Sequence, residues 1–293
     1  MTPPTSPRIA IALGAGGAKG LAHLSVLAAL DEMGLKPVHV SGSSIGAITG
    51  AAYAAGIPAA DLQKHAMASF QDRAKLIARL LQARVGKFSD ITLSKLWAGK
   101  IGNPVLVDGE LLLDLFWPEA VPDRFEALAI PFTAVATDYH QRCEVRLSSG
   151  PLTPAVAASM AIPGLVRPVT IGGRMLIDGG AVNPLPYDVF ERELAQKIDL
   201  TIAVDLGGGE ARNAVGERPM PDAIEAMMGA SQIMMGHLVQ HMIARQPPGL
   251  LIRPKVDHFS GLEFMRVKEI IAAGDSIKDD VKRQVEAALA AVR

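Results

Sequence analysis

The chain has 293 residues, of which 49% are hydrophobic and 20% charged, and its formal net charge is −1 at pH 7. This length allows one large α/β domain or two small ones with a sizeable core, while the balanced charge and few aromatic residues argue against a nucleic-acid partner. Cys143 is the single cysteine, which excludes an intramolecular disulfide and gives no metal-type spacing.

The first part of the chain predicts the order strand, helix, strand, helix. The apolar run 8–13 ends in glycines and predicts a buried strand, and apolar residues at helical spacing predict a helix over 21–33. A second strand is predicted over 37–41, followed by a helix of small residues after Ser44. This order is typical of the βαβ start of a mostly parallel sheet with a right-handed crossover.

Residues 58–127 combine helical and loop-like patterns with several prolines, so we interpret them as a cap or insertion. The later strands are predicted at 131–137, at 143–147, in a hairpin over 166–177, at 199–206 and at 250–253. The later helices are predicted at 153–161, at 221–245 and from about 262 onward. A segment rich in glycine and charge, 207–219, is predicted to be flexible.

The most informative motif is Gly-x-Ser-x-Gly at 42–46, directly after the second predicted strand. At a sharp strand-to-helix bend, a nucleophilic serine, here Ser44, is pushed out of the backbone toward the end of the sheet. The chain on either side of such a serine comes so close that glycine is needed to avoid a clash, and Gly42 and Gly46 stand at those offsets. The alternative is a strand–helix turn whose serines merely cap the helix.

A second glycine-rich turn, 14–20, follows the first predicted strand and enters a helix. Such turns present backbone N–H groups to an anion. One interpretation is a dinucleotide-binding loop, but Gly14 and Gly16 would need a third glycine where Lys19 stands, and the expected acidic residue is missing. The other interpretation is an oxyanion hole, which a parallel βαβ unit would place beside Ser44.

A nucleophilic serine needs a base, and the seven histidines offer no clear one. In the chain order serine, acid, histidine, the candidates are His237, His241 and His258. The first two share one face of a predicted helix and are interpreted as surface or interface residues, while His258 follows a predicted strand and stays a candidate. His23 and His39 are interpreted as structural.

Asp178 is the better candidate for the base, because it ends an apolar strand and begins a glycine turn at a sheet edge. A carboxylate near its reference pKa of about 3.9 is a weak base, but burial in an apolar pocket would raise that pKa and improve proton acceptance. An Asx turn capped by the same side chain is the structural alternative.

Together these segments resemble the patatin-like phospholipases, a family of plant storage acyl hydrolases, cytosolic phospholipases and many bacterial proteins. The stretch 16–20 is similar to the family's glycine loop, and 42–46 is similar to its nucleophile elbow. Further along, 155–164 is similar to the helix and turn between the catalytic residues, and 178–186 to the segment with the second of them. The motif glycines are Gly14, Gly20, Gly42, Gly46, Gly179 and Gly180.

The resemblance implies a catalytic dyad without histidine, with Ser44 as the nucleophile and Asp178 as the general base that later acts as the acid. By position, it implies an oxyanion hole formed by the N–H groups of Gly16, Gly17 and Ala18. Lys19 would support the loop or the lipid phosphate. The family's first loop glycine corresponds to Ala15 here, which leaves open which N–H groups point at the oxyanion.

The fold implied is a three-layer α/β/α patatin-like fold with a mostly parallel central sheet. The catalytic core would span 9–206, and a C-terminal helical extension over 207–293 would pack on the same domain. The function implied is hydrolysis of carboxylic esters of lipids, such as phospholipids, lysophospholipids or simpler acyl esters, through an acyl-serine intermediate. The resemblance implies no metal or organic cofactor, and no acidic loop with calcium-ligand spacing is present.

The start of the chain lacks the basic residues and apolar stretch of a signal peptide, and no run reaches the roughly 18 apolar residues of a transmembrane helix. We therefore expect a cytoplasmic protein. Its mean hydropathy of +0.25 suits peripheral contact with a membrane, and equally a large buried core. The sequence is also compatible with a homo-oligomer.

The helix predicted over 221–245 is rich in methionine, a residue that forms adaptable apolar surfaces. Its methionines include Met227, Met228, Met234 and Met235. One interpretation is a flap that faces an acyl chain or a membrane, and the other is ordinary core or a dimer interface. Two further functions stay open: a lipid-binding or regulatory module with little turnover, and an α/β-hydrolase esterase with a histidine base.

Overall fold

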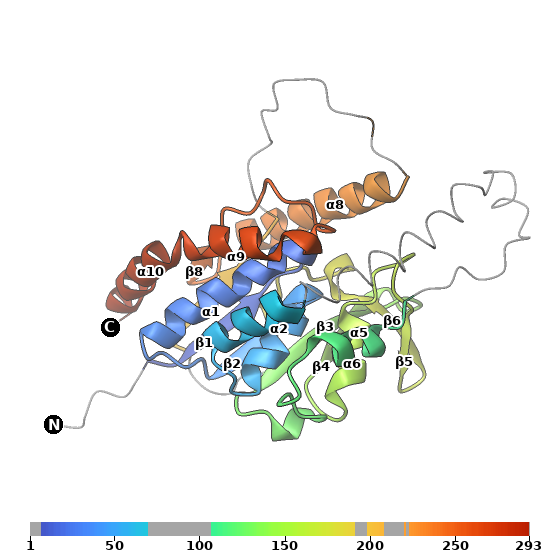
Figure 1. The fold of residues 1–293 in the computed structure, drawn as a ribbon, viewed down its shortest axis with the longest axis horizontal. Helices are drawn as coiled ribbons and strands as arrows, with labels where there is room; N and C mark the ends of the chain where they lie inside the picture. The colour runs from blue at the N-terminus through green and yellow to red at the C-terminus, as the bar shows by residue number, and fades with distance from the viewer. Residues whose placement is uncertain (1–6, 70–106, 191–197, 208–219, 221–222, 293) are drawn as a thin grey trace, which may run out of the picture.

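The computed structural model describes residues 7–69, 107–190, 198–207, 220 and 223–292, and Figure 1 shows their arrangement. The strands are β1 (Ile9–Leu13), β2 (His39–Ser43), β3 (Phe132–Asp138), β4 (Cys143–Leu147), β5 (Val169–Ile171), β6 (Arg174–Asp178), β7 (Leu200–Val204) and β8 (Leu250–Ile252). The α-helices are α1 (His23–Glu32), α2 (Ile45–Ala54), α5 (Gly109–Phe116), α6 (Leu152–Ser159), α8 (Ala223–Arg245), α9 (Val267–Asp275) and α10 (Lys278–Ala291). Short 3₁₀ helices are η1 (Gly17–Ala22), η2 (Phe125–Ala127), η3 (Gly179–Ala181) and η4 (Phe264–Arg266).

The strands form a single mixed sheet that is mostly parallel, as predicted. The neighbours β3, β2, β1, β7 and β8 are paired in parallel in that order. On the other side, β4 and β6 pair antiparallel with β3, and β5 pairs antiparallel with β6, which confirms the hairpin predicted over 166–177. Because β1 and β2 are adjacent and parallel, the turns that follow them meet at one edge of the sheet.

The alternation of side chains along β1 separates two apolar layers. One side of the strand packs against buried residues of α1, α2 and α10, through Ile9, Ile11 and Leu13. Ala10 and Ala12 face the other way, against the segment 185–190 and α8. Figure 1 shows α1, α2, α9 and α10 together on one side of the sheet. Both faces of the sheet are therefore covered, as the parallel strands require, and the α/β/α arrangement agrees with the predicted fold class.

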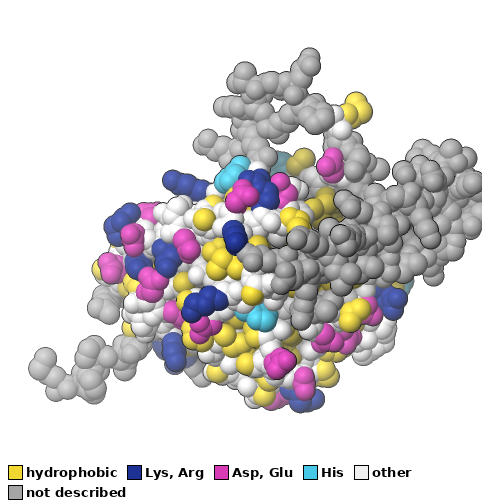
Figure 2. All heavy atoms as spheres, viewed as in Figure 1, with side chains coloured by type: hydrophobic (Ala, Val, Ile, Leu, Met, Phe, Trp, Pro, Cys, Tyr) yellow, Lys and Arg dark blue, Asp and Glu magenta, His cyan; other side chains and the backbone are white. Residues whose placement is uncertain are grey.

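The C-terminal part of the chain contributes to this fold in two places. The strand β8 extends the sheet beside β7, and α9 and α10 pack on α1. Glu32 of α1 forms ion pairs with Lys278 and Lys282 of α10. On the face seen in Figure 2, acidic and basic side chains are interspersed rather than gathered by sign, in line with the near-neutral net charge.

Several element boundaries differ from the sequence predictions. The strand expected over 37–41 is β2, two residues later, because Pro37 has no N–H for the ladder. The helix expected over 21–33 is preceded by η1 and becomes α-helical at His23. The single C-terminal helix predicted from about 262 is wrong: the chain forms α9 and α10, and the Ser276 hydroxyl turns back onto the Ala273 carbonyl where α9 ends.

Two predicted segments lie largely outside the described residues. Of the cap or insertion expected over 58–127, a helix over 59–69 and the part from 107 onward are described. The flexible segment expected over 207–219 is described only at Gly207. Within the described residues, the structure has no helix with both the length and the apolar character needed to cross a bilayer.

Candidate active site

Ser44 stands at the bend between β2 and α2 in an unusual backbone conformation. Its φ of 56° and ψ of −123° are values that a residue other than glycine seldom adopts. A Cβ at Gly42 would lie 2.3 Å from the Gly46 carbonyl oxygen, and a Cβ at Gly46 would lie 2.0 Å from the Leu13 carbonyl oxygen. Both glycines are therefore sterically required, as their spacing predicted. Strain of about 1–3 kcal/mol at such a residue is a feature that clusters at functional sites.

The carboxylate of Asp178 lies directly against this serine. Ser44 Oγ donates a hydrogen bond of 2.6 Å to Asp178 Oδ2, and the Gly180 N–H donates one of 2.7 Å to Oδ1. Asp178 ends β6 and also caps η3, so the Asx turn that the sequence leaves open as an alternative is present beside the contact with Ser44. Burial raises the pKa of Asp178 to about 6, against the lowering effect of the two hydrogen bonds. The site therefore joins a hydroxyl to a carboxylate able to accept its proton near neutral pH.

The raised pKa of Asp178 predicts a pH dependence. Because the carboxylate accepts a proton only when it is ionised, modification of Ser44 by a fluorophosphonate should slow as the pH falls through about 6. Rates measured between about pH 4.5 and 8 should fall about tenfold for each pH unit below the midpoint. Circular dichroism at each pH would show that the protein stays folded. A rate that does not change across this range would argue against Asp178 as the base.

The glycine-rich turn after β1 lies against the start of α2. A Cβ at Gly20 would lie 2.2 Å from Cγ2 of Ile45, the residue after Ser44. The Ala18 N–H donates to the Gly261 carbonyl at 2.8 Å, whereas the N–H groups of Gly16 and Gly17 have no acceptor among the described residues. Of the three N–H groups that the family resemblance assigned to an oxyanion hole, one is thus engaged within the chain. Those of Gly16 and Gly17 are free to receive an anion.

Gly17 holds this turn in a conformation that suits only glycine. It has a φ of +61°, and a Cβ there would lie 2.3 Å from the Gly261 carbonyl oxygen. We expect Gly17→Ala to destabilise the protein by about 2–4 kcal/mol, because the positive φ and the steric clash both oppose a side chain. Gly34→Ala is the matched control, since Gly34 has a φ of +67° with nothing within 4 Å. It should cost only about 1–2 kcal/mol in urea unfolding. Equal losses in the free energy of unfolding of the two variants would contradict this steric explanation.

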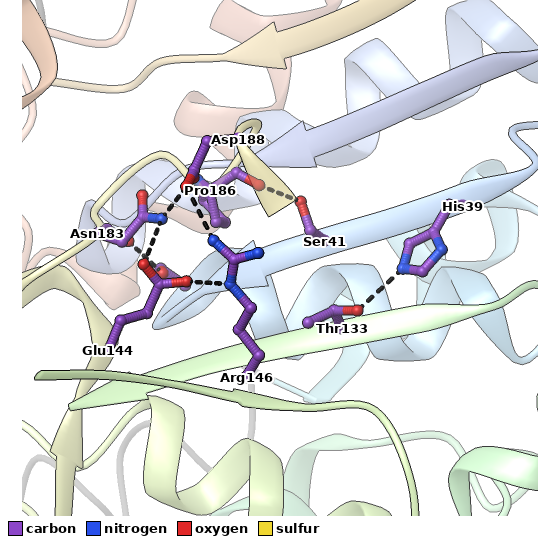
Figure 3. A network of polar contacts seen from close by, with 9 residues as sticks. His39, Ser41, Thr133, Glu144, Arg146, Asn183, Pro186 and Asp188 are labelled. Carbon is purple, nitrogen blue, oxygen red and sulfur yellow. Dashed lines mark hydrogen bonds and ion pairs between the residues drawn. The ribbon is translucent and has the colours of Figure 1, made fainter. Parts of the chain in front are cut away.

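A polar network ties the segment after β6 to β4 (Figure 3). Arg146 forms ion pairs with Glu144 and, at 2.8 Å, with Asp188. Asn183 Nδ2 donates to the same two carboxylates, at 3.2 and 2.7 Å. The Asn183 carbonyl in turn accepts a hydrogen bond of 2.6 Å from the hydroxyl of Ser43, the residue before Ser44. The sequence alone does not reveal this network, because alternating charges on a predicted strand indicate only a solvated face.

Ser44 forms no hydrogen bond with any of the seven histidines, all of which lie in the described part of the chain. His23 Nε2 lies 2.8 Å from the Gly14 carbonyl oxygen, and His39 Nε2 lies 2.9 Å from the Thr133 hydroxyl. Burial lowers the pKa of both imidazoles to about 4, so both are neutral at neutral pH. Both are therefore structural, as predicted, and His23 fixes the start of the glycine-rich turn.

A cavity of about 820 Å³ lies beside the glycine-rich turn, between α8 and the segment 257–263. Gly16, Lys19, His237 and His258 are among its lining residues. Lys19 is buried there, whereas the imidazole of His258 rests on the ring of the next residue, Phe259. The structure therefore brings Lys19 close to the predicted oxyanion donors and places His258 in the cavity wall.

The methionine-rich helix α8 lies against the loops that contain Gly164 and Gly180. A Cβ at Gly180 would lie 2.6 Å from Met235 Sδ, and one at Gly164 would lie 3.3 Å from Met227 Cε. On the outer side of the helix, Met234 is 64% exposed. Met235 therefore faces the turn after Asp178, whereas Met227 and Met234 are exposed.

Comparison with protein families and curated proteins gives consistent results. The family model described as patatin-like phospholipase matches residues 11–191. The chain is 39% identical over 215 residues to an uncharacterized NTE family protein of Mycobacterium tuberculosis, a match that covers 73% of this chain and 53% of that protein. It is 26% identical over 302 residues to lysophospholipase NTE1 of Kluyveromyces lactis, covering 95% of this chain and 19% of that protein. The chain thus spans about half the length of the mycobacterial relative.

Comparison with solved structures gives more distant similarities. VipD from Legionella pneumophila matches with a TM-score of 0.47 and 15% identity, covering 96% of this chain and 67% of that one. Human GIVD cytosolic phospholipase A2 matches with a TM-score of 0.41 and 13% identity, covering 97% of this chain and 60% of that one.

Proposed function

Because the chain belongs to the patatin-like phospholipase family, we propose that it is a lipid acyl hydrolase that cleaves carboxylic esters through an acyl-serine intermediate on Ser44. The observation that carries this proposal is the 2.6 Å hydrogen bond from Ser44 Oγ to the buried carboxylate of Asp178. Nucleophilic catalysis requires such a pair, in which a base stands within reach of the attacking hydroxyl.

In the first step, Ser44 Oγ attacks the ester carbonyl carbon while its proton passes to Asp178 Oδ2. The N–H groups of Gly16 and Gly17 stabilise the negative charge that develops on the carbonyl oxygen. As the bond to the alcohol oxygen breaks, Asp178 returns the proton to that oxygen, and the acyl group remains on Ser44. Water then attacks the acyl carbon and gives a proton to Asp178. The carboxylic acid leaves as Ser44 regains its proton.

The substrates are acyl esters of lipids. The relative named lysophospholipase NTE1 makes lysophospholipids the first class to test, beside phospholipids and simpler acyl esters. Lys19 would support the glycine-rich turn or meet a lipid phosphate, because it is buried in η1 and lines the same cavity as Gly16. The helix α8 would act as a flap over the dyad, with Met235 as the side chain that a substrate displaces.

The direct test is release of fatty acid from lysophosphatidylcholine micelles and from soluble nitrophenyl esters of graded chain length. The proposal predicts turnover of both, without added metal or cofactor. A lipid-binding module with little turnover would instead bind liposomes without releasing fatty acid. An esterase with a histidine base would lose its activity in His258→Ala, whereas a Ser44–Asp178 dyad predicts that this variant remains active.

A further inference from the structure

The end of α6 contacts the backbone of both members of the proposed dyad. Ser159 Oγ accepts a hydrogen bond of 3.0 Å from the N–H of Ser44. The Ala161 carbonyl accepts one of 3.0 Å from the N–H of Asp178. One short stretch of chain thus holds the nucleophile and the carboxylate, which are 134 positions apart in the sequence.

Ser159 is itself fixed in place. Its side chain is completely buried, and its hydroxyl donates a hydrogen bond of 2.5 Å to the Val135 carbonyl of β3. The same carbonyl oxygen lies against the residue after Asp178, since a Cβ at Gly179 would come within 2.1 Å of it. The hydroxyl therefore has one orientation available, with its lone pairs turned toward the Ser44 N–H.

The N–H of Ser44 needs this partner for a structural reason. Ser44 is the N-cap of α2, and the first N–H groups of a helix have no acceptor within the helix. Its backbone is also strained, so it keeps this conformation only when its surroundings enforce it. The Ser159 hydroxyl supplies the acceptor at this point, where both serines are buried.

We propose that Ser159 is a positioning residue that holds Ser44 in the strained conformation from which its hydroxyl reaches Asp178. This inference rests on the proposed function, because it concerns the reactivity of the same serine. Without the Ser159 hydroxyl, the Ser44 backbone relaxes and the distance from Ser44 Oγ to Asp178 Oδ2 lengthens. A displacement of about 1 Å in a reacting group can lower a rate by about 10²-fold.

The chain provides a matched control in Ser25. Its side chain is also completely buried, its hydroxyl donates to the Ile271 carbonyl, and it accepts a hydrogen bond from Gln63. Ser25 lies on α1, and neither of these hydrogen bonds involves Ser44, Asp178 or Ser159. Ser25→Ala therefore removes the same kind of buried hydroxyl as Ser159→Ala without touching Ser44.

The experiment compares wild type, Ser159→Ala, Ser25→Ala and Ser159→Thr by the rate of fluorophosphonate labelling and by kcat and KM on a soluble nitrophenyl ester. In Ser159→Ala we expect labelling and kcat to fall by about 10- to 100-fold, with KM changed by less than about threefold. Ser25→Ala should lower the melting temperature by a similar amount but keep both rates within about twofold. Ser159→Thr retains the hydroxyl and should recover most of the lost rate.

A second readout separates positioning from a general loss of stability. Three factors set the pKa of Asp178, namely burial, the Ser44 hydroxyl and the Gly180 N–H, and none of them is a charged side chain. The hydrogen bond from Ser44 lowers that pKa, so weakening it in Ser159→Ala should move the pH midpoint of labelling upward. Ser25→Ala should leave the midpoint unchanged.

Each other outcome overturns the proposal. Labelling of Ser159→Ala within about twofold of wild type would show that Ser44 needs no such support. Equal losses of labelling rate in Ser159→Ala and Ser25→Ala, with an unchanged pH midpoint of labelling, would show that Ser159 has a purely structural role. If Ser159→Thr does not fold, the comparison of Ser159→Ala with Ser25→Ala still distinguishes a positioning role from a purely structural one. Absence of labelling in folded wild type would reject the proposed function itself, and this inference with it.

Discussion

Replacement of Ser44 by alanine is expected to abolish fluorophosphonate labelling and to lower ester turnover by about 10⁴-fold or more, because no other hydroxyl takes the place of a missing nucleophile. The alanine keeps the Cβ, so the strained backbone at the elbow need not change. The loss should therefore be chemical, with the protein still folded. Ser25→Ala, which removes a buried hydroxyl from α1, serves as the control and should retain activity.

The measurement is the rate of fatty acid release, with circular dichroism to confirm the fold of each variant. Residual activity of Ser44→Ala within about tenfold of wild type would point to a different nucleophile or to a reaction that needs none. Normal binding of Ser44→Ala to liposomes, together with the loss of turnover, would separate lipid binding from catalysis.

Asp178→Asn is expected to lower the labelling rate of Ser44 by about 10²- to 10⁴-fold, which is the usual contribution of a general base. The amide cannot take up the proton of Ser44. The fold should survive, because the amide oxygen can take the place of Oδ1 and keep the bond from the Gly180 N–H, while the amide NH2 donates to Ser44 Oγ, whose hydroxyl can rotate. A variant that is labelled as fast as wild type would exclude Asp178 as the base.

The same substitution should raise stability at neutral pH. Burial raises the pKa of Asp178 from its ordinary value of 3.8 to about 6 in the folded state, so ionising this carboxyl destabilises the folded state by about 3 kcal/mol at pH 7. This cost grows as the pH rises from about 4 to 6 and vanishes below the lower value. Urea unfolding should therefore find Asp178→Asn more stable than wild type at pH 7, by up to about 3 kcal/mol, and similar to it near pH 3.5. A large loss of stability at pH 7 would contradict the burial argument.

Local sequence motifs predict most of the residues of the candidate site. The glycines around Ser44 predict the tight bend, because their spacing reflects a steric rule that acts over a few residues. An apolar strand that ends in Asp178 and a glycine turn predicts a carboxylate at a sheet edge. The mostly parallel sheet follows from the strand–helix–strand order of the first part of the chain, since β1 and β2 pair in parallel as such a unit requires.

Contacts between segments that are distant in the chain could not be predicted from the sequence. The bond from the Ala18 N–H to the Gly261 carbonyl joins the glycine-rich turn to the C-terminal part of the chain, and no local pattern signals it. The hydrogen bond between Ser44 and Ser159 also has no local sequence signal, although the stretch 155–164 resembles a segment of the family. Such pairings depend on how helices pack on the sheet, which periodicity does not encode.

The central claim is that Ser44 is a nucleophile activated by Asp178, and intact-mass analysis after incubation with a fluorophosphonate tests it most directly. We predict a single adduct on wild type and on His258→Ala, no adduct on Ser44→Ala, and a much reduced adduct on Asp178→Asn. Loss of labelling in His258→Ala alongside undiminished labelling of Asp178→Asn would contradict the dyad and indicate a histidine base. No adduct on folded wild type would contradict a competent serine hydrolase altogether.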